Sequence, residues 1–599
     1  MKTNAAQHAV LATLLKSLAA ATGLPEQELA GQLGRPPKAE MGDYAFPCFA
    51  FAKQNNLAPP AAAAQLAGKL SSDPLLSAVI EKIEAAGPFL NIKALPGALS
   101  ASIIELVRAQ GESYGSSPEG AGRTVVIDYS APNIAKPFHV GHLMSTILGA
   151  SLVRIHRALG YNVVGVNHLG DWGVQCGFQF LGWQRADPAE REKQLAARGL
   201  DYLCELYIDI NDAAKGDPSI DQQARVLFKK LEDGDAELRA LWQRFRTVTL
   251  EYLQLSYDRL GVVFESTNGE AFYEPMLKPL LAELKASGVA VESEGALVIP
   301  MDDAPPKPGK DPKPPLILLK SDEASIYATR DLAAVLYRKK TYDFARCLYV
   351  IDVRQSQYMQ MLFKAVKKIG HAWAGDCAHV SFGLMQIKEG ENVQAMSTRG
   401  GRMISLKEVL DRMVAVVRGI VQEKNPELSA EKTARVAEDV GVGAIIFWVQ
   451  ARRRASNFVF DWKQATDPAG DTGPYLQYTH ARACSILRKA GARSAQGSGE
   501  REGGAAALTL LAQPEEVAVA RALEGFPRAV QQAAADHEPS LIASYLLELA
   551  SVFGNFLNKH RVIDSEPELR AARLALVDTV RGVLARGLGL LGVAAPEEL

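Results

Sequence analysis

The spacing of apolar and polar residues divides the chain into three parts, of which the middle one, about 123 to 465, is the longest. Short apolar runs alternate there with long stretches of helical spacing. The runs predict strands at Thr124–Tyr129, Asn162–Val166, Cys347–Ile351 and His379–Phe382. The stretches between them predict helices at Leu143–Leu159, Tyr202–Ala213, Glu237–Leu260 and Met359–Ile369. This alternation predicts an α/β doubly wound, Rossmann-like core on a parallel sheet.

The two flanking parts have different patterns. Residues 1–112 predict a small α+β domain, with helices at 5–22 and 59–71 and a strand that ends near Lys93. The last part, 474–599, predicts an all-α bundle with helices at Tyr475–Ala490, Glu515–Ala535, Leu541–Asn558 and Glu568–Leu591. We therefore expect a multidomain protein with domains at 1–112, 123–465 and 474–599. A proline- and lysine-rich segment near 305–315 is expected to be a solvated insertion.

Composition narrows the class of protein. The chain has 599 residues, of which 48% are hydrophobic and 22% charged, as in soluble globular proteins. Six cysteines without a C-x-x-C pair argue against a disulfide framework and against zinc, and predict reduced, mostly buried thiols. The N-terminal stretch predicts an amphipathic helix rather than a signal peptide, and no apolar run reaches the length of a membrane span. We expect a cytoplasmic protein with no membrane partner.

Two histidines stand at the turn between the first strand of the middle part and its helix. His139 and His142 flank Gly141 where the helix begins. A helix N-terminus offers free N–H groups and the positive end of the helix dipole, and a glycine lets a phosphate or a base approach the backbone. The turn predicts a nucleotide site. The alternative is a helix-capping loop that happens to contain two histidines.

A second candidate for nucleotide binding follows the fourth predicted strand. It is short, basic and rich in glycine, and it runs through Met396, Ser397, Thr398, Arg399 and Gly400 to Arg402. Hydroxyl groups and arginines on such a loop can close over a triphosphate and neutralise charge. The alternative is a basic hairpin loop without a ligand. If both loops lie at the carboxyl ends of strands in one sheet, they meet where open α/β sheets bind ligands.

Together these motifs resemble class I aminoacyl-tRNA synthetases, with His139–His142 as the HIGH motif and Met396–Gly400 as the KMSKS-type loop. The fuller resemblance is to arginyl-tRNA synthetases of the bacterial type, and it extends through all three parts of the chain. It is carried by Gly42–Ala45, Ala131–Lys136, Asn167–Gly173, Tyr327–Asp331 and Phe458–Trp462. Two departures are present: Ala131 stands where the family usually has Ser, and Arg399-Gly400 replaces the final lysine of the loop.

The resemblance implies roles for individual residues. Lys136, just ahead of the histidines, would replace the missing loop lysine, unless it is only a solvated loop residue. The catalytic residues would be Lys136, His139 and His142. The residues that bind ATP would be His139, Gly141, His142, Met396, Ser397, Thr398 and Arg399. The residues that bind arginine would be Asp128, Ala131, Pro132, Asn133, His142, Tyr327, Asp331 and Gln355.

The chemistry of the candidate arginine residues suits a guanidinium, which prefers carboxylates and a flat aromatic neighbour. Tyr327 and Asp331 are four residues apart, so they share a face if this stretch is helical. Asp128, at the end of the first strand, would point to the same crevice. The alternative for Asp331 is a surface salt bridge to Arg330 or Arg338.

Candidates for tRNA binding come from the two flanking domains. Phe89 and Asn91 are two apart on a predicted strand, where an aromatic ring can stack on a loop base while an amide reads its edge. The alternative is that Phe89 lies in the core and Asn91 forms a turn. In the helical domain Tyr478 and Arg482 suit a phosphate-and-stacking surface, unless this is only a solvated helix face. His480, Arg488 and Lys489 are further candidates there.

The activity that the resemblance implies is arginine–tRNA ligation in two steps, through an arginyl-adenylate. The partners would be tRNA(Arg), L-arginine and ATP, with Mg²⁺ carried by ATP, no zinc and no organic cofactor, and the chain would act as a monomer. The first step would need bound tRNA. Three alternatives stay open: another class I ligase, a synthetase-like binding protein without catalysis, and a nucleotidylyltransferase.

Overall fold

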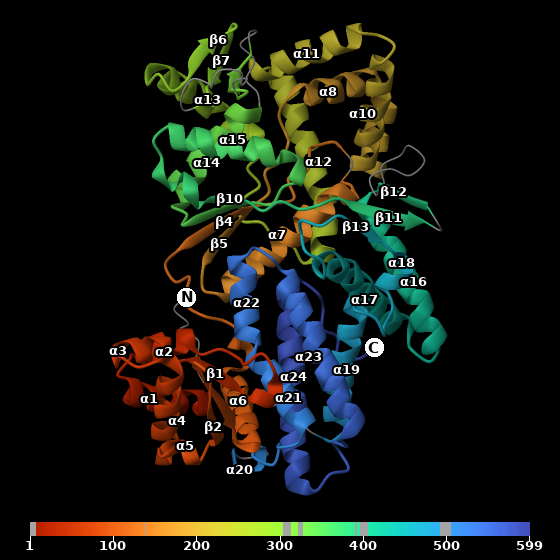
Figure 1. Ribbon diagram of the computed structural model, residues 1–599. Coiled ribbons are helices and arrows are strands. Elements are labelled where there is room, and N and C mark those ends of the chain that lie inside the picture. The colour runs from red at the N-terminus through yellow and green to blue at the C-terminus, as the bar shows by residue number, and fades with distance from the viewer. Residues whose placement is uncertain are drawn as a thin grey trace.

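The computed structural model describes residues 8–136, 138–302, 313–320, 327–389, 392–395, 405–491 and 505–599. Figure 1 shows an α/β part above and a bundle of long helices below, with a small N-terminal domain beside the bundle. This arrangement confirms the predicted fold class: a parallel-sheet core, a small α+β domain and an all-α C-terminal part.

The N-terminal domain is built on an antiparallel sheet in the order β1-β3-β2. Its strands are β1 (Tyr44–Pro47), β2 (Ile80–Ala86) and β3 (Phe89–Ala94). Its helices are α1 (Ala9–Thr22), α2 (Glu26–Gln32), α3 (Phe49–Gln54), α4 (Pro59–Ser71), α5 (Pro74–Ser77) and α6 (Pro96–Gln110). Leu14, Leu66 and Ile92 are fully buried between the helices and the sheet. The helices expected at 5–22 and 59–71 correspond to α1 and α4.

Four parallel strands form the central sheet, in the order β10-β9-β4-β5. They are β4 (Thr124–Asp128), β5 (Asn162–Val166), β9 (Arg346–Tyr349) and β10 (Cys377–His379). The chain leaves β4 for β5 on one side and later enters β9 on the other, so the strand order reverses between β4 and β9. Such a reversal opens a crevice outside the carboxyl ends of the strands. The fourth strand was predicted about two residues too late.

Helices cover both faces of this sheet, as its alternating side chains require. Val125 and Ile127 of β4 belong to the apolar cluster that includes α7 (Val140–Ala158). Val126 points to the other face, into a cluster with α14 (Tyr327–Tyr342) and α15 (Ser356–Lys368). A strand buried on both sides has a continuous apolar sequence, which is why the run at Thr124 was recognisable.

Two insertions stand at the carboxyl edge of the sheet (Figure 1). The helical one contains α8 (Val174–Arg185), α9 (Pro188–Arg198), α10 (Leu200–Ala214), α11 (Ser219–Glu232) and α12 (Ala236–Leu260). The other contains α13 (Glu270–Ala286), β6 (Val291–Ser293), β7 (Ala296–Ile299) and β8 (Leu316–Leu319). The helical insertion has its own core around Phe180, Trp183 and Phe245. Of these elements only α10 and α12 were predicted.

A short second sheet links the core to the C-terminal bundle. It consists of β11 (Met385–Glu389), β12 (Asn392–Ala395) and β13 (Phe458–Phe460), with β11 antiparallel to β12 and parallel to β13. The helices of this region are α16 (Leu406–Lys424), α17 (Ala430–Gln450) and α18 (Trp462–Ala465). Ser405 caps α16 in a capping box with Glu408, which fixes where this helix begins.

The C-terminal bundle consists of α19 (Gly473–Lys489), α20 (Ala505–Leu508), α21 (Pro514–Glu524), α22 (Phe526–Ala535), α23 (Ser540–Lys559) and α24 (Pro567–Leu591). The single helix predicted over Glu515–Ala535 is wrong in its continuity, because the chain breaks at Gly525. Pro527 follows at the start of α22. A proline has no N–H to continue the ladder of the preceding helix, so it begins a new one.

In the part of the chain that the structure describes, α23 is the one helix long and apolar enough to cross a membrane. Its apolar side chains Ile542, Leu546, Leu549 and Phe553 are fully buried, and the helix packs against α21, α22 and α24. This is the pattern of a central helix in a globular bundle, which is apolar because neighbouring helices surround it.

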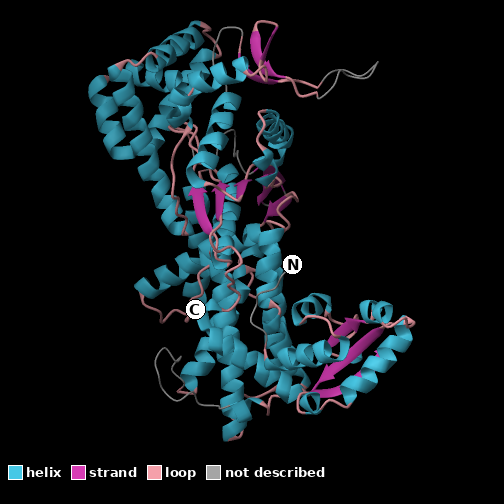
Figure 2. Cartoon of the chain, turned by 90° about the vertical axis from the view of Figure 1, so that its left-hand side faces the viewer, coloured by secondary structure: helices cyan, strands magenta, loops and turns pink. Residues whose placement is uncertain are grey.

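Figure 2 shows the small N-terminal domain set against the long helices of the bundle. A buried polar cluster joins this domain to α21. His8 Nε2 lies 3.2 Å from Glu524 Oε1, and Arg521 Nη2 lies 2.6 Å from Asp43 Oδ1. Burial alone would raise the pKa of Glu524, but the hydrogen bond to His8 and the charge of Arg521 lower it to about 2. The carboxylate therefore stabilises this contact above its ordinary pKa, and the stabilisation is lost as the pH falls toward 2.

Candidate active site

The turn after β4 has an unusual backbone. Ser130 and Ala131 are non-glycine residues with φ of 72° and 49°, in the left-handed region. Side chains from other segments hold them there: the Ser130 N–H donates to Ser145 Oγ at 2.9 Å, and the Ala131 N–H donates to Asn167 Oδ1 at 3.1 Å. Strained turns persist only where their surroundings fix them, and they are common at active sites.

His139 and His142 both cap α7. The Gly141 N–H donates to His139 Nδ1 at 2.9 Å, and His142 Nδ1 lies 3.3 Å from the His139 N–H, which makes a capping box. The capping alternative is thus part of the structure, although it leaves each Nε2 available for a ligand. In neutral His139 the proton must be on Nε2, because Nδ1 accepts a hydrogen bond.

Burial keeps these imidazoles uncharged. Burial lowers the pKa of His139. Burial, together with the unfavourable interaction with His139 when both rings are protonated, lowers the pKa of His142 to about 3. The His142 ring stacks on Phe138 with the ring centroids 5.2 Å apart. At neutral pH the two histidines therefore offer hydrogen bonds to a phosphate, but no positive charge.

The position of the His139 ring requires glycine at position 141, independently of any ligand. A Cβ at this position would lie 2.5 Å from His139 Cε1. The missing side chain therefore lets the His139 ring fold over the helix end. This reason was not foreseen from the sequence, which suggested only the approach of a ligand.

Lys136 lies against the helical insertion. Its Nζ lies 5.0 Å from the centre of the Tyr207 ring in α10, and the side chain is half-buried. The structure therefore does not bring Lys136 into contact with His139 or His142. A lysine side chain has four flexible carbons, so its ammonium can reach either side of the crevice.

Tyr327 and Asp331 share one face of α14, as the sequence predicted for a helix. The Tyr358 hydroxyl donates to Asp331 Oδ2, and the Tyr327 and Tyr358 rings are 4.9 Å apart. The Tyr327 side chain is 55% exposed, so one side of this aromatic and acidic cluster is open to solvent. Burial raises the pKa of Asp331 from its ordinary value. The cluster has the planar, acidic character that a guanidinium prefers.

Asp128 already has a cationic partner. Its Oδ2 lies 2.8 Å from Nη1 of Arg338, whose side chain is 1% exposed. Arg330 pairs instead with Glu270 and Glu274, at 2.8 and 3.0 Å. The alternative that Asp331 forms a surface salt bridge with one of these arginines is wrong for Arg338, which is buried against another carboxylate.

The remaining candidates for arginine binding line the turn and the helix opposite. Pro132 and Asn133 pair with the segment at Gly170: the Gly170 N–H donates to the Pro132 carbonyl at 3.0 Å, and Asn133 forms a parallel bridge with Gly170. Gln355 is exposed in the short turn just before α15. These residues and Ala131 come from the carboxyl ends of β4 and β9, where the strand order reverses.

The basic loop candidates Met396, Ser397, Thr398, Arg399 and Gly400 lie outside the described residues. The chain on its far side is described and returns to the histidine turn. His139 and Ser405 form an antiparallel bridge, and the Leu406 N–H donates to the Phe138 carbonyl at 2.8 Å. The residue that follows the loop is therefore anchored beside the HxGH turn.

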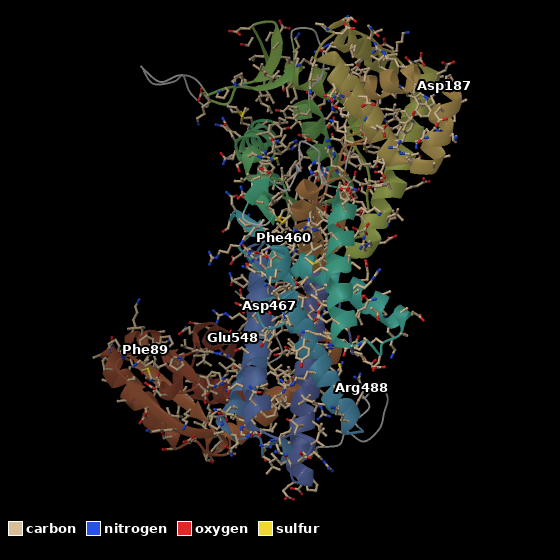
Figure 3. The ribbon with its side chains drawn as sticks, turned by 90° about the vertical axis from the view of Figure 1, so that its right-hand side faces the viewer. Phe89, Asp187, Phe460, Asp467, Arg488 and Glu548 are labelled. Atoms are coloured by element: carbon tan, nitrogen blue, oxygen red, sulfur yellow. The ribbon has the colours of Figure 1, made fainter. Side chains whose placement is uncertain are left out.

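Phe89 lies at the surface of the N-terminal domain. It is 40% exposed, and its ring is 5.8 Å from that of Phe49, which is 51% exposed (Figure 3). Asn91 is inside strand β3 and 8% exposed. The alternative of a core phenylalanine and a turn asparagine is wrong on both points. The surface feature is a pair of aromatic rings, with the amide largely buried.

In the helical bundle Tyr478 and Arg482 are exposed on one face of α19. His480 is 2% exposed and lies 2.9 Å from the Pro596 carbonyl, so its expected place on a binding surface is wrong. It faces the bundle because it is two residues from each of the exposed pair. Figure 3 shows Arg488, from the same helix, on the opposite side of the molecule from Phe89.

Several residues of the crevice were missed by sequence reasoning. His168 lies between Arg338 and Asp331, with distances of 3.3 and 3.7 Å from its ring nitrogens. The motif Asn167–Gly173 contains this histidine, so a signal was present. Tyr358 gave no signal, because only the packing of α15 against α14 brings it to Asp331.

Comparisons with known proteins agree with this geometry. The chain matches the family models for the class I (R) tRNA synthetase catalytic domain over residues 104–462, the DALR anticodon binding domain over 476–599 and the arginyl tRNA synthetase N terminal domain over 8–94. The arginine–tRNA ligase of Clostridium botulinum (strain Alaska E43) is 41% identical over 94% of this chain and 95% of its own length. That of Clostridium perfringens is 40% identical over the same shares.

Solved structures show the same fold. The arginyl-tRNA synthetase of Thermus thermophilus aligns with a TM-score of 0.76 at 26% identity, over 98% of this chain and all of that one. The Plasmodium falciparum enzyme aligns at 0.73 and 21% identity over 98% of both chains, which shows the fold alone. With a catalytic family model over more than half its length, the chain belongs to the arginyl-tRNA synthetase family of class I aminoacyl-tRNA synthetases.

Proposed function

We propose that this chain is an arginine–tRNA ligase that activates L-arginine with ATP and transfers it to tRNA(Arg). The arginine carboxylate attacks the α-phosphorus of ATP, and pyrophosphate leaves. A hydroxyl of the 3′-terminal ribose then attacks the carbonyl carbon of arginyl-adenylate, and AMP leaves. The observation that supports this proposal is the Tyr327–Asp331–Tyr358 cluster, in which a carboxylate and two aromatic rings come together on α14 and α15.

In this proposal Asp331 and Tyr327 bind the guanidinium, because they supply a carboxylate and an exposed ring on one face of α14. Asn133, His142 and Gln355 bind the α-amino and carboxylate groups of arginine from the ends of β4 and β9. Ala131 and Pro132 shape this end of the pocket through their backbone. Asp128 contributes to the arginine pocket indirectly, through its ion pair with Arg338.

The phosphates of ATP bind at the N-terminus of α7. His139 donates a hydrogen bond from Nε2, His142 lies beside it, and Gly141 leaves room for the nucleotide. Because burial keeps both histidines neutral, positive charge has to come from elsewhere. We assign it to Lys136 and to the loop with Met396, Ser397, Thr398 and Arg399. Such positioned charge is the main contribution of a protein to phosphoryl chemistry.

Mg²⁺ enters this proposal as part of the ATP substrate, held by phosphate oxygens and water. We include no zinc and no organic cofactor. In the described ranges there is no group of three or more His, Cys, Asp or Glu side chains that could hold a metal, and all six cysteines are unpaired and buried. We further propose that the protein acts as a cytoplasmic monomer without a membrane partner.

For tRNA we propose two contacts far from the crevice. Phe89, with Phe49 beside it, stacks on a splayed loop base, next to the largely buried Asn91 on the same strand. Tyr478 and Arg482 contact the anticodon stem and loop from α19. The two sites lie on different domains that share the Glu524 cluster.

Pyrophosphate exchange tests the first step. ATP–pyrophosphate exchange is expected with arginine and cognate tRNA together, and not with lysine or cysteine in place of arginine. The reason is that the crevice offers carboxylate and aromatic groups, which match a planar cation. Exchange should be followed as labelled pyrophosphate incorporated into ATP, with and without tRNA. Strong exchange with lysine or cysteine would contradict the assignment.

A further inference from the structure

A chain of polar side chains runs beneath the Tyr327–Asp331–Tyr358 cluster. It begins at Asp128 on β4, continues through Arg338 on α14 and reaches His168 in the loop after β5. Arg338 Nη1 lies 2.8 Å from Asp128 Oδ2, and Arg338 Nη2 lies 3.3 Å from His168 Nδ1. His168 Nε2 faces Asp331 Oδ1 at 3.7 Å. This row of side chains therefore ends at the Asp331 carboxylate, which would bind the guanidinium.

The contact with Arg338 determines the tautomer of His168. A guanidinium has only N–H donors, so His168 Nδ1 has to be the acceptor of that contact. A neutral imidazole then carries its proton on Nε2, the atom that faces Asp331. This Nε2 is buried and has no hydrogen-bond partner in the part of the chain that the structure describes.

The charges of these four side chains, Asp128, Arg338, His168 and Asp331, also match one substrate cation. Asp128 and Arg338 cancel each other, and neutral His168 adds nothing, so Asp331 leaves a net charge of −1. A guanidinium of charge +1 balances it. If His168 took a second proton, the cluster would become neutral before the substrate arrived, and His168 Nδ1 would present an N–H to the N–H groups of Arg338.

We propose that His168 and Arg338 are positioning residues for arginine recognition. Arg338 holds His168 in the Nε2–H tautomer, and the Nε2–H group orients Asp331 toward the guanidinium of the substrate. This inference rests on the proposed function and adds to it two residues that act through Asp331. Arginine binding then depends on a neutral histidine.

Charged and titratable groups face His168 from every side. They are Asp128 on β4, Arg338 and Asp331 on α14, Asp171 in the same loop and Tyr273 on α13. Burial outweighs the three carboxylates and lowers the pKa of His168, so the ring is neutral at neutral pH. If the pH falls far enough to protonate this ring, arginine affinity is therefore expected to fall.

Two substitutions separate positioning from mere packing. The amide nitrogen of Gln can replace Nε2, whereas the amide of Asn reaches only the Nδ1 position. His168→Asn is expected to weaken arginine binding roughly 10- to 100-fold, as for the loss of a hydrogen bond to a charged group, while His168→Gln weakens it by less than about fivefold. ATP affinity should stay the same in both. Calorimetric titration of the full-length protein with arginine and with ATP measures this.

The pH profile supplies an independent readout. Because burial lowers the pKa of His168, wild-type arginine affinity is expected to fall only below about pH 6.5, the ordinary histidine range, and His168→Gln should flatten that fall. Burial raises the pKa of Glu270 to about 7, so this group, which also interacts with Asp331, titrates above that range. Glu270→Gln removes that separate titration, and it should keep the fall below about pH 6.5 that His168 produces.

The outcomes are distinct. If the wild type binds no arginine at any pH, the proposed function fails and this inference fails with it. If the wild type binds arginine and both His168 variants bind it as tightly, with unchanged unfolding midpoints, only the positioning roles are overturned. An equal loss of ATP and arginine affinity in His168→Asn would show general damage to the crevice, and would also overturn them.

Discussion

Asp331→Asn is expected to weaken arginine binding by roughly 30-fold to several thousand-fold, because a guanidinium left without its carboxylate in a desolvated pocket loses about 2–5 kcal/mol. The side chain is 28% exposed at one edge of the crevice and accepts a hydrogen bond from Tyr358. Asn keeps the shape and can still accept that hydrogen bond, so the charge alone is removed. Titration with arginine measures the change.

Asp343→Asn is the control for this variant. Asp343 follows the same helix, is 93% exposed and pairs only with Lys339 among the described ion pairs. Its φ of 42° suits Asn as well as Asp, so no strain is added. Arginine and ATP should bind this control as they bind the wild type. Wild-type arginine affinity in Asp331→Asn would refute the pocket on α14.

Lys136→Ala is expected to slow adenylate formation by roughly 100-fold or more, on the scale of one lost preorganised donor in the transition state. The expectation rests on charge. The two histidines at the phosphates are neutral, and the KMSKS-type loop has Arg399-Gly400 where a final lysine would stand. Single-turnover formation of arginyl-adenylate with tRNA present measures the rate.

Two further variants serve as controls for the rate of adenylate formation in Lys136→Ala. Lys285→Ala removes an exposed lysine that pairs with Glu292 at 2.6 Å, and it should leave the rate unchanged. Tyr207→Leu removes the ring under Lys136 without removing the ammonium, so its effect should be less than about tenfold. An unchanged rate in Lys136→Ala would mean that the basic loop at 396–402 supplies the charge alone.

Local patterns predicted the parts of the fold that local physics decides. The strand at Thr124 was recognisable because both faces of β4 are buried, and α12 because its apolar residues repeat at helical spacing over 25 residues. The pair Tyr327 and Asp331 was predicted from the same spacing. The short strands β6, β7 and β8 were missed, because three or four residues are too few for a period to show.

The partners of the site residues could not be predicted in the same way. Asp128 and Arg338 are 210 positions apart, and only the packing of α14 on the sheet brings them together. The sequence offered Arg338 as a partner for Asp331, about two helical turns away, because local spacing was the only guide. The dual use of His139 and His142 as helix caps likewise depends on ring orientations that a motif does not contain.

The most direct test of the account is aminoacylation of total tRNA with each proteinogenic amino acid in turn. The account predicts acid-precipitable charging with arginine, dependent on ATP and limited to arginine-accepting tRNA. Charging with a different amino acid, or adenylate formation from arginine without any transfer to tRNA, would contradict it.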